Sequence, residues 1–420
     1  MSIETQITEM AQAGKRASRR VAALDTAEKN QILEAIADGL ERSTAEIIEA
    51  NAKDLAAAEE NGLSSAMIDR LTLDDGRVKA IADAVRQIVK LDDPVGAVID
   101  EFTGAQGIEI RKVRSPIGVI GIIFESRPNV TVDAAVLCLK SGNATILRGG
   151  REAIHSNTAL AKVINESGCA AGLPENAIQL IPFTDRAAVP ALCQADESVD
   201  LIIPRGGRGL IEAVISCSRV PVIKHLDGIC HVYVAASADP EMAKSIALNA
   251  KVQRPGVCNA METLLVDRGS ADQLPGIAAA LHAAGVELRV DPEAADAIGD
   301  AAPTVAATED DWHTEYLDLV LSVKVVDGVD AAIDHINHYG SGHSDGIVSG
   351  DAGEVKLFLA GVDSSTVYHN ASTRFTDGEM FGFGAEIGIS TDKLHARGPM
   401  ALPELTTYKY EVHGTGQVRG

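Results

Sequence analysis

Residues 117–150 have the sequence IGVIGIIFESRPNVTVDAAVLCLKSGNATILRGG, and this stretch decides the fold class. It opens with the nearly continuous apolar run IGVIGIIF, which is typical of a strand buried on both faces of a parallel sheet. A helical segment at 131–142 and a second apolar strand at 144–150 follow. Strand, helix and strand in succession predict a doubly wound α/β sheet, in which ligands bind at the carboxyl ends of the strands.

The same alternation continues toward the C-terminus. A helix at 152–169 is followed by three further apolar stretches that we expect to be strands, at 177–182, 199–204 and 221–226. A short helix separates the first two stretches, and a helix from 210 separates the last two. A second αβ unit follows from 239 to about 367, in which strands again alternate with helices. The chain is long enough for two or three domains, so we expect the two series to form separate domains.

Two regions outside these series have other patterns. Residues 3–93 carry apolar residues at helical spacing, which predicts helices, with Ser43 and Glu46 as a capping box. Residues 95–115 alternate around a Gly-rich turn and predict a hairpin, and LTTYKYEVHG at 405–414 is typical of one more strand. Strands that lack a partner in their own chain predict a homodimer or homotetramer that pairs them between subunits.

Composition narrows the functional class. Of the 420 residues 46% are hydrophobic and 23% are charged, and the net charge is −23. Such acidity disfavours nucleic acid and anionic membranes as partners, and it serves either solubility or adaptation to high salt. No apolar run approaches the roughly 20 residues that span a bilayer. The N-terminus lacks a secretory pattern and the six cysteines form no CxxC pair, so we expect a cytoplasmic protein with reduced thiols.

The sequence NAKVQRPGVCNAMET at 249–263 contains the candidate nucleophile, Cys258. A helix ends before the Pro-Gly pair that precedes the cysteine and a strand begins after it, so the thiol lies in a turn. Positive charge on Lys251 and Arg254 favours the thiolate, which is the reactive form. Most cysteines act as small buried apolar residues, and this interpretation fits the other five, which lie in apolar runs or on helix faces.

A dinucleotide site is predicted where the second strand of the first series ends. The chain lacks GxGxxG, but RGGR at 148–151 brings Arg148, Gly149 and Arg151 to the edge of the sheet where ligands bind. Arginines there, with no acidic residue before Glu152, favour the 2′-phosphate of NADP. Two solvated arginines on a turn explain the same pattern equally well.

A second glycine-rich turn, PRGGRG at 204–209, ends another strand and opens a helix. The backbone N–H groups at the start of a helix bind anions, so Arg205, Gly206 and Gly207 are candidates for contact with a phosphate. Close packing of a strand against a helix requires the same residues. The turn therefore supports a cofactor site only together with the first one.

No metal site is predicted. His335 and His338 lie three residues apart on an expected helix and His343 follows, but no cysteine or carboxylate pattern of ligands accompanies them. Histidines on the polar face of a helix are the preferred interpretation.

Three segments resemble one branch of the aldehyde dehydrogenase superfamily, the gamma-glutamyl phosphate reductases. They are NAKVQRPGVCNAMETLLV at 249–266, residues 115–157, and DKLHARGPMALPELTTYKY at 392–410. The resemblance covers nearly the whole chain. It implies an aldehyde dehydrogenase-like α/β fold, with a Rossmann-type cofactor domain, a second αβα catalytic domain and a small β oligomerisation element.

The resemblance also implies a reaction: the reduction of L-glutamyl 5-phosphate by NADPH to L-glutamate 5-semialdehyde and phosphate, the second step of proline biosynthesis. Cys258 matches the family nucleophile, which expels phosphate and forms a thioester that hydride reduces. The implied cofactor is NADP(H), the substrate is a small molecule, and glutamate 5-kinase is a candidate partner. The leaving phosphate needs cations. The candidates are Lys251, Arg254, Arg374, Lys393 and Arg397.

Further positions are assigned by the resemblance alone. The sequence FESRP stands where the wider superfamily has PWNFP, so either Ser126 or the nearby Asn129 is the oxyanion donor. In KHLDG, His225 stands where a Glu activates water in hydrolysing relatives. In TEYLDL, Glu315 matches a ribose-binding Glu, and Arg148 replaces a ribose-contacting Lys.

These matches give an expected division of the chain. Residues 1–95, 114–235 and 368–390 are assigned to the NADP-binding domain and 236–367 to the catalytic domain. The hairpin at 96–113 and the tail at 391–420 are assigned to oligomerisation. Two other functions stay open: a hydrolytic aldehyde dehydrogenase, and a non-catalytic dinucleotide-binding protein of the same fold. The intact polar setting of Cys258 argues against the second.

Overall fold

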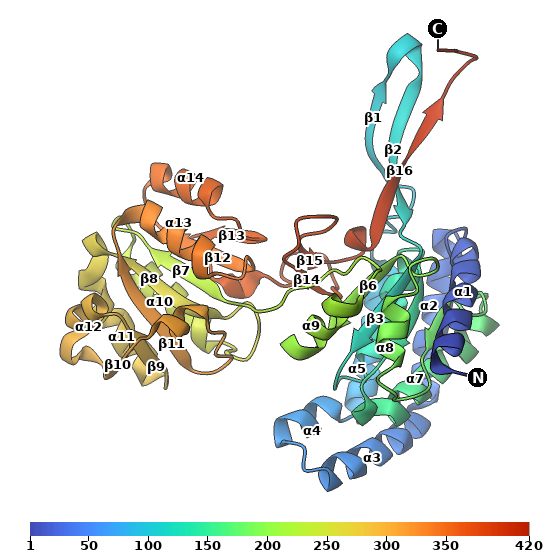
Figure 1. Ribbon diagram of the computed structural model, residues 1–420, viewed down its shortest axis with the longest axis horizontal. Coiled ribbons are helices and arrows are strands. Elements are labelled where there is room, and N and C mark those ends of the chain that lie inside the picture. Colours follow the sequence, from blue (N-terminus) through green and yellow to red (C-terminus); the bar gives the residue numbers. More distant parts are fainter. Residues whose placement is uncertain (420) are drawn as a thin grey trace. The chain divides into compact units, whose positions relative to one another are not determined.

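The computed structural model describes residues 1–419, which form two compact units (Figure 1). The first unit comprises Met1–Lys224, Phe383–Gly388 and the C-terminal segment from Met400. The second comprises His225–Gly382 and Ile389–Pro399. Within the described residues, no helix is both long enough and apolar enough to cross a membrane.

The first unit begins with helices, as the apolar spacing predicted. Their bounds are α1 Ile3–Val21, α2 Thr26–Arg42, α3 Thr44–Glu60, α4 Ser65–Leu71 and α5 Asp75–Lys90. The capping box lies at Asp25 and Glu28, where each side chain accepts from the backbone N–H of the other residue. The box expected at Ser43 is absent because the backbone of Ser43 also ends α2, and its side chain makes no cap hydrogen bond.

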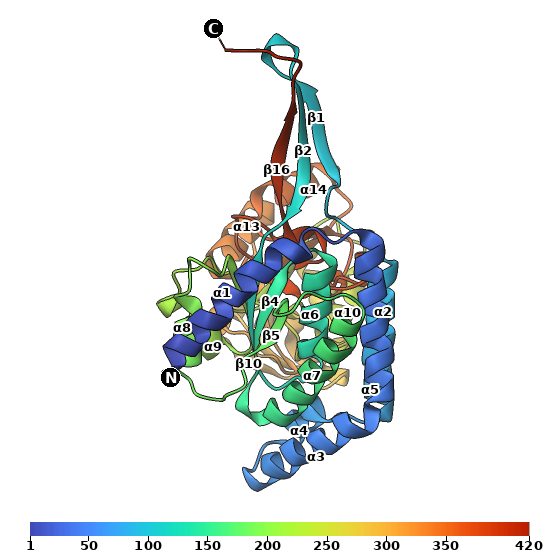
Figure 2. The same ribbon diagram turned by 90° about the vertical axis from the view of Figure 1, so that its right-hand side faces the viewer.

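A four-stranded parallel sheet forms the centre of the first unit, in the order β5-β4-β3-β6. Its strands are β3 Val119–Phe124, β4 Ala144–Arg148, β5 Ile178–Leu180 and β6 Leu201–Arg205. The helices that alternate with them are α6 Val130–Lys140, α7 Ile154–Ala170, α8 Ala188–Cys193 and α9 Arg208–Cys217, with the short helix η2 Arg151–Ala153 before α7. Figure 2 shows α1 lying across β4.

One strand expected in this series does not form. The segment 221–226 makes only an isolated parallel bridge, between Val222 and Ile202 of β6. Pro221 has no N–H to donate, which removes one hydrogen bond of a ladder. The segment after Lys224 already belongs to the second unit, so the chain leaves the sheet here.

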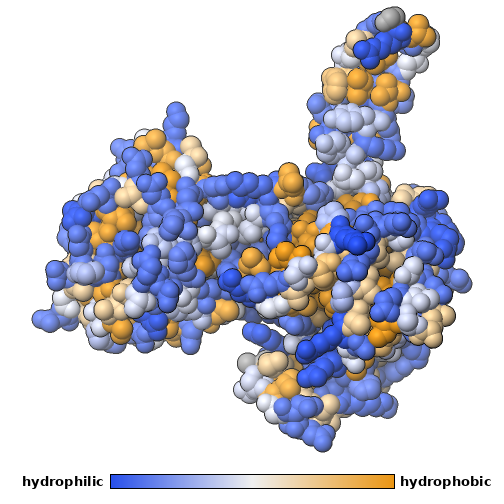
Figure 3. All heavy atoms as spheres, viewed as in Figure 1, coloured by the Kyte–Doolittle hydropathy of each residue, from blue (hydrophilic) through white to orange (hydrophobic). Residues whose placement is uncertain are grey.

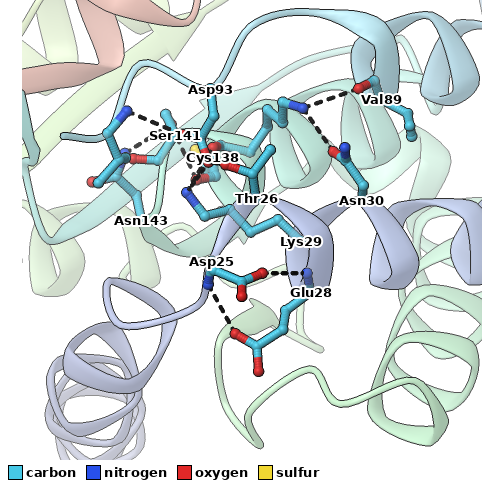
Figure 4. Close-up of polar contacts among 12 residues, drawn as sticks. Asp25, Thr26, Glu28, Lys29, Asn30, Val89, Asp93, Cys138, Ser141 and Asn143 are labelled. Atoms are coloured by element: carbon cyan, nitrogen blue, oxygen red, sulfur yellow. Dashed lines mark hydrogen bonds and ion pairs between the residues drawn. The ribbon is translucent and has the colours of Figure 1, made fainter. Parts of the chain in front are cut away.

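A buried polar cluster joins three helices to the chain that leads into the hairpin (Figure 4). Lys29 of α2 is 1% exposed, and its Nζ lies 2.7 Å from the carboxylate of Asp93. Lys140, at the end of α6, donates to the side chain of Asn30 and to the carbonyl of Val89. Burial lowers the pKa of Lys140. The cluster therefore fixes α2, α5 and α6 against the residues that precede the hairpin.

The hairpin forms as predicted, but its partner strand comes from the same chain. The antiparallel sheet has the order β1-β2-β16, with β1 Val98–Thr103, β2 Glu109–Pro116 and β16 Thr406–His413. The expectation that the C-terminal strand lacks a partner within the chain is therefore wrong. The short helices η1 Ala105–Gly107 and η7 Pro403–Leu405 flank these strands. Every residue of β1 is exposed, and Figure 3 shows apolar side chains on the surface of this arm.

The second unit is built on a seven-stranded parallel sheet in the order β10-β9-β11-β8-β7-β12-β13. Its strands are β7 Cys230–Val234, β8 Met261–Asp267, β9 Glu287–Val290, β10 Thr304–Ala306, β11 Val320–Val326, β12 Ser344–Val348 and β13 Thr366–His369. The helices are α10 Pro240–Val252, α11 Leu274–Ala283, α12 Pro292–Ile298, α13 Gly328–Tyr339 and α14 Ala352–Gly361. Short helices η3 Arg268–Gln273, η4 Gly299–Ala301, η5 Glu309–His313 and η6 Thr373–Phe375 complete it.

Helices cover both faces of this sheet. Val232 and Val234 of β7 pack with α10, α11 and α12, whereas the intervening Tyr233 packs with α13 and α14. This alternation places a core on each side, which is why the strands are apolar along their length. Two short strands, β14 Gly388–Ser390 and β15 Gly398–Met400, pair where the chain passes between the units.

The units divide the chain differently from the sequence-based assignment. β7 and the residues before it from His225 lie in the second unit, although the assignment carried the cofactor domain to 235. Residues 368–382 also lie there, because β13 and the loop after it pack on β12. Which unit binds cofactor and which performs the chemistry stays a prediction.

Candidate active site

Cys258 lies in a turn between α10 and β8, as the Pro-Gly break predicted. Its side chain is half-buried, and its carbonyl oxygen accepts a hydrogen bond from the thiol of Cys230 at 3.2 Å. Gly228 packs so closely on the backbone of Cys258 that a Cβ atom at position 228 would overlap the carbonyl group. Only glycine therefore fits at this contact.

The neighbour of the nucleophile is tied to another loop. The Asn259 side-chain amide donates to the backbone carbonyl of Thr376 at 2.8 Å, and the backbone carbonyl of Asn259 accepts from the hydroxyl of Thr373 at 2.8 Å. Asn259 and Thr373 are both buried. Residues 373–376 are thus fixed beside the turn that carries Cys258.

That loop brings one arginine to the turn. Arg374 Nε donates to the side chain of Gln253 at 2.8 Å, just before Arg254. Burial lowers the pKa of Arg374, the positive charge of Arg254 lowers it further, and Cys258 acts in the opposite direction. The guanidinium group of Arg374 is therefore close enough to interact with both Arg254 and Cys258, and an anion bound there would relieve the repulsion between the two arginines.

The other three candidate cations have carboxylate partners. Lys251 and Glu262 form an ion pair at 2.5 Å with both side chains fully buried, so Lys251 is not a cation that faces substrate. Lys393 and Arg397 both bind the carboxylate of Asp363. Among the five predicted cations, the geometry favours Arg374 and Arg254.

Two histidines connect to the nucleophile turn through Cys230, whose thiol lies 3.7 Å from the Nδ1 of His343. His225 is half-buried, its Nδ1 lies 2.9 Å from the carbonyl of Ile389, and its ring meets that of His343 edge-on at 5.7 Å. Burial lowers the pKa of His343 to about 3, and burial raises the pKa of the Cys230 thiol well above its ordinary value. The Cys258 backbone therefore contacts a protonated thiol, Cys230, which in turn contacts a neutral histidine, His343.

The histidines of helix α13 differ in exposure. His335 is buried, so its expected place on a polar helix face is wrong, whereas His338 is exposed.

Glu315 contacts the same region through Gly228. Its carboxylate accepts the Gly228 N–H at 2.8 Å, and burial raises its pKa. The carboxylate that the resemblance assigns to a ribose thus also holds the segment that packs on Cys258. Sequence reasoning did not reveal Gly228, whose only signal is a glycine in the KHLDG motif.

In the first unit, the two candidate oxyanion donors have partners of their own. Ser126 has a positive φ of 51°, and both its N–H and its hydroxyl donate to one oxygen of Glu152. The Asn129 amide donates to Asp133, whose pKa burial raises to about 6. The Ser126 hydroxyl has a single hydrogen, which it already donates to Glu152 in a hydrogen bond. The Asn129 amide has a second N–H that can donate to another acceptor.

The arginines after β4 differ from each other. Arg148 is 9% exposed, donates to the carbonyls of Gly149 and Thr184, and keeps a buried Nε without a hydrogen-bond partner. Arg151 is exposed. Burial lowers the pKa of Arg148, the carboxylates of Glu152 and Glu125 act in the opposite direction, and Arg186 lowers the pKa a little further. The interpretation of two equivalent solvated arginines is therefore wrong for Arg148.

The second glycine-rich turn lies at the N-terminus of α9. The Gly207 N–H donates to the carboxylate of Glu125 at 3.0 Å, and Gly206 packs against that carboxylate. Arg205 approaches Gly388, where a Cβ atom would overlap its guanidinium group. Sequence reasoning missed Glu125, which follows β3 and reaches the start of α9.

The structure therefore places the candidate residues in two groups. The second unit holds Cys258, His225, Glu315 and the two favoured arginines. The first unit holds Ser126 and Asn129, together with the expected cofactor-binding residues Arg148, Gly149, Arg151, Arg205, Gly206 and Gly207.

Comparison with known proteins agrees with this fold. The chain matches the aldehyde dehydrogenase family over residues 2–319. It therefore belongs to the aldehyde dehydrogenase family. It is similar to the crystal structure of a gamma-glutamyl phosphate reductase from Thermotoga maritima, with 46% sequence identity and a TM-score of 0.96 over 99% of this chain and 100% of that chain.

Two further crystal structures are similar. A gamma-glutamyl phosphate reductase from Saccharomyces cerevisiae is 31% identical, with a TM-score of 0.54, over 100% of this chain and 99% of that one. An acetylating aldehyde dehydrogenase from Geobacillus thermoglucosidasius shares the fold at 17% identity and a TM-score of 0.67, over 100% of this chain and 99% of that one. The two reductases confirm the resemblance drawn from the three sequence segments.

Proposed function

We propose that this protein reduces L-glutamyl 5-phosphate to L-glutamate 5-semialdehyde and phosphate with NADPH, the second step of proline biosynthesis. The observation that carries the proposal is the turn of Cys258, a half-buried thiol beside Arg374 in a chain that matches a gamma-glutamyl phosphate reductase along its whole length. A small acyl phosphate is the substrate, and glutamate 5-kinase, which makes it, is a candidate partner in a cytoplasmic setting.

The chemistry follows from the groups in the second unit. The Cys258 thiolate attacks the acyl carbon, a carbon–sulfur bond forms, and the bond from that carbon to the phosphate oxygen breaks. Arg374 and Arg254 stabilise the negative charge of the departing phosphate. His225, which stands where hydrolysing relatives carry a Glu, has its Nδ1 2.9 Å from the Ile389 carbonyl. The resemblance assigns the oxyanion donor to either Asn129 or Ser126.

The cofactor supplies the hydride, and the residues after β4 and β6 fit a dinucleotide. Gly207 and Gly209 at the start of α9 face open space, so a pyrophosphate that displaces the Glu125 carboxylate from the Gly207 N–H can reach the helix N-terminus. The buried Nε of Arg148 lacks a partner, and Arg151 is exposed. The structure of an engineered glycolyl-CoA reductase, which shares 17% sequence identity with this chain, contains bound NADP+. Selection of NADP is tested by Arg151→Glu, which should weaken NADPH binding far more than NADH binding.

Homo-oligomerisation through the β1-β2-β16 sheet is part of the proposal. This sheet carries exposed large apolar side chains on both outer strands: Val98, Ile99, Phe102, Tyr408, Tyr410 and Val412. An apolar edge of this kind is normally covered. Light scattering should give at least twice the chain mass of 44.0 kDa at micromolar concentration, and the mass of a single chain would contradict this assignment.

The test of the reaction generates the labile acyl phosphate in place. Glutamate, ATP and a glutamate kinase are combined with this protein and NADPH, and NADPH oxidation is followed by absorbance. Cys258→Ala should abolish the reaction and leave NADPH binding and solubility nearly unchanged, because only the nucleophile is removed. Oxidation by the alanine variant at the wild-type rate would rule out the covalent mechanism.

A further inference from the structure

The turn that carries Cys258 is spanned by a buried ion pair. Lys251 lies in the last turn of α10 and Glu262 lies near the start of β8, so the pair joins the two ends of residues 252–261. The Lys251 Nζ lies 2.5 Å from a Glu262 carboxylate oxygen, and both side chains are 0% exposed. The pair therefore closes the nucleophile turn at its base, away from solvent.

The same pair is connected to the backbone of Cys258. The second oxygen of Glu262 accepts the Leu317 N–H at 3.2 Å. Two residues before Leu317, Glu315 accepts the Gly228 N–H, and Gly228 packs on the Cys258 carbonyl. One path thus runs from Lys251 through Glu262 and the 315–317 segment to the peptide group of the nucleophile.

Stability alone does not account for this pair. Taking two charges out of water costs several kcal/mol for each ion, and apolar residues of similar volume are often as stabilising or more so. Burial lowers the pKa of Lys251 and raises that of Glu262, which is the sign of that cost. Unlike apolar packing, a hydrogen-bonded ion pair is directional, because the ammonium group and the carboxylate fix each other's distance and orientation.

We propose that Lys251 and Glu262 are positioning residues that hold the Cys258 turn in the geometry in which the thiolate attacks. The inference rests on the proposed function for its catalytic consequence, but it also predicts a property of the thiol itself. The surrounding groups are the ring of Tyr316, whose centre lies 5.8 Å from the Lys251 Nζ, and the nearby carboxylates of Asp318 and Glu315. None of these groups replaces the ion pair of Lys251 with Glu262, which joins the two ends of the turn.

The test separates positioning from charge. Glu262→Gln and Lys251→Met change the local charge in opposite directions. If the pair positions the turn, kcat falls in both variants by roughly tenfold to a hundredfold while KM changes little, because small displacements of a reacting group have costs of that size. If the pair acts only through the electrostatic effect of its charges on the thiol, the pKa of Cys258 moves in opposite directions in the two variants, and kcat changes in opposite directions as well. That outcome would overturn the inference.

A double variant provides the second arm. Lys251→Met with Glu262→Leu replaces the pair by apolar side chains, so the fold should stay intact while kcat stays low. Full recovery of kcat in this variant would show that the pair merely fills space. The matched control is Asp267→Asn, which removes the charge of the group that accepts from the Tyr233 hydroxyl at the opposite end of β8. It should lower stability without the loss in kcat.

Alkylation keeps the inference independent of the proposed reaction. At a pH where the thiol is fully ionised, the rate at which iodoacetamide modifies the peptide that contains Cys258 reports access and orientation of this thiol rather than its pKa. Peptide mass spectrometry separates this signal from that of the exposed Cys169. Loosening the turn should raise this rate about threefold or more in Glu262→Gln and in Lys251→Met, and not in Asp267→Asn. Unchanged rates would contradict the inference even if the protein acts on another substrate. A wild-type protein without reductase activity would instead refute the proposed function.

Discussion

At the scale of single residues, the structure assigns different tasks to cations that look alike in the sequence. Lys251 and Arg254 both lie near Cys258 in the chain, but Lys251 is enclosed with Glu262 whereas Arg254 is exposed. Arg374 is distant in sequence and reaches the turn through a hydrogen bond to Gln253. Charge near a cysteine in sequence therefore does not identify the group that meets its substrate.

Arg374 is expected to stabilise the leaving phosphate. Arg374→Gln should lower kcat/KM by about a hundredfold, because a preorganised donor to developing charge is worth that much. In the reverse reaction the KM for phosphate should rise. Lys393→Gln is the control, since Lys393 is paired with Asp363 in the same unit, and it should change the rate by less than about twofold. Equal losses in the two variants, measured as initial rates of NADPH oxidation, would remove the special role of Arg374.

At the scale of helices and strands, local pattern predicted most elements and tertiary contact decided the rest. The strand at 119–124 was predictable because its apolar run has no other stable place than a buried sheet. β10 escaped prediction because it consists of three exposed residues. The partner of β16 could not be predicted, because β16 and β2 lie about 300 residues apart in the sequence and meet only when the chain folds.

The candidate site shows the same limit. Pro255 and Gly256 mark the turn of Cys258 in the sequence, so the nucleophile could be found there. The pairing of Lys251 with Glu262 and the contact of Gly228 with Cys258 form only when separate elements fold together. The burial of Arg148 depends likewise on the loop at Thr184.

The buried cluster that joins α2, α5 and α6 should contribute strongly to stability. Lys29→Met leaves the Asp93 carboxylate buried without its counter-ion, and removal of one partner of a buried pair costs about 3–5 kcal/mol. Lys162→Met is the control, because its pair with Glu46 is half exposed and should cost less than about 1 kcal/mol. Urea unfolding followed by circular dichroism measures both. A cost for Lys29→Met as small as that of the control would show that the cluster does not hold these helices.

At the scale of the whole molecule, buried histidines make stability depend on pH. Burial lowers the pKa of His335 from 6.5 to about 2. Positive charge on four neighbouring side chains acts in the same direction, namely His231, Lys324, His338 and His313. Below pH 6.5 the unfolded chain binds a proton at His335 that the folded chain does not bind. The contribution of neutral His335 to the free energy of unfolding is therefore present above that pH and is lost as the pH falls. Acid should therefore weaken the second unit before its carboxylates titrate.

His335→Phe isolates this effect, because a phenyl ring keeps the packing against Trp312 and Tyr339. Relative to wild type, the unfolding free energy of the variant should rise by about 2 kcal/mol between about pH 8 and pH 5, since each pKa unit is worth about 1.4 kcal/mol. Unfolding curves of both proteins across this range provide the measurement. Parallel pH profiles would mean that His335 accepts a proton in the folded state.

The central claim concerns the whole molecule: the Cys258 thioester is exchanged with phosphate and not with water. The most direct measurement runs the reaction in reverse, with L-glutamate 5-semialdehyde and NADP, and follows NADPH by absorbance with and without phosphate. The proposed site has Arg374 near the Cys258 turn and, by the resemblance, His225 where hydrolysing relatives carry a Glu, so NADPH should appear only when phosphate is present. Steady NADPH production in phosphate-free buffer, with glutamate as the product, would show a hydrolytic aldehyde dehydrogenase and contradict the account.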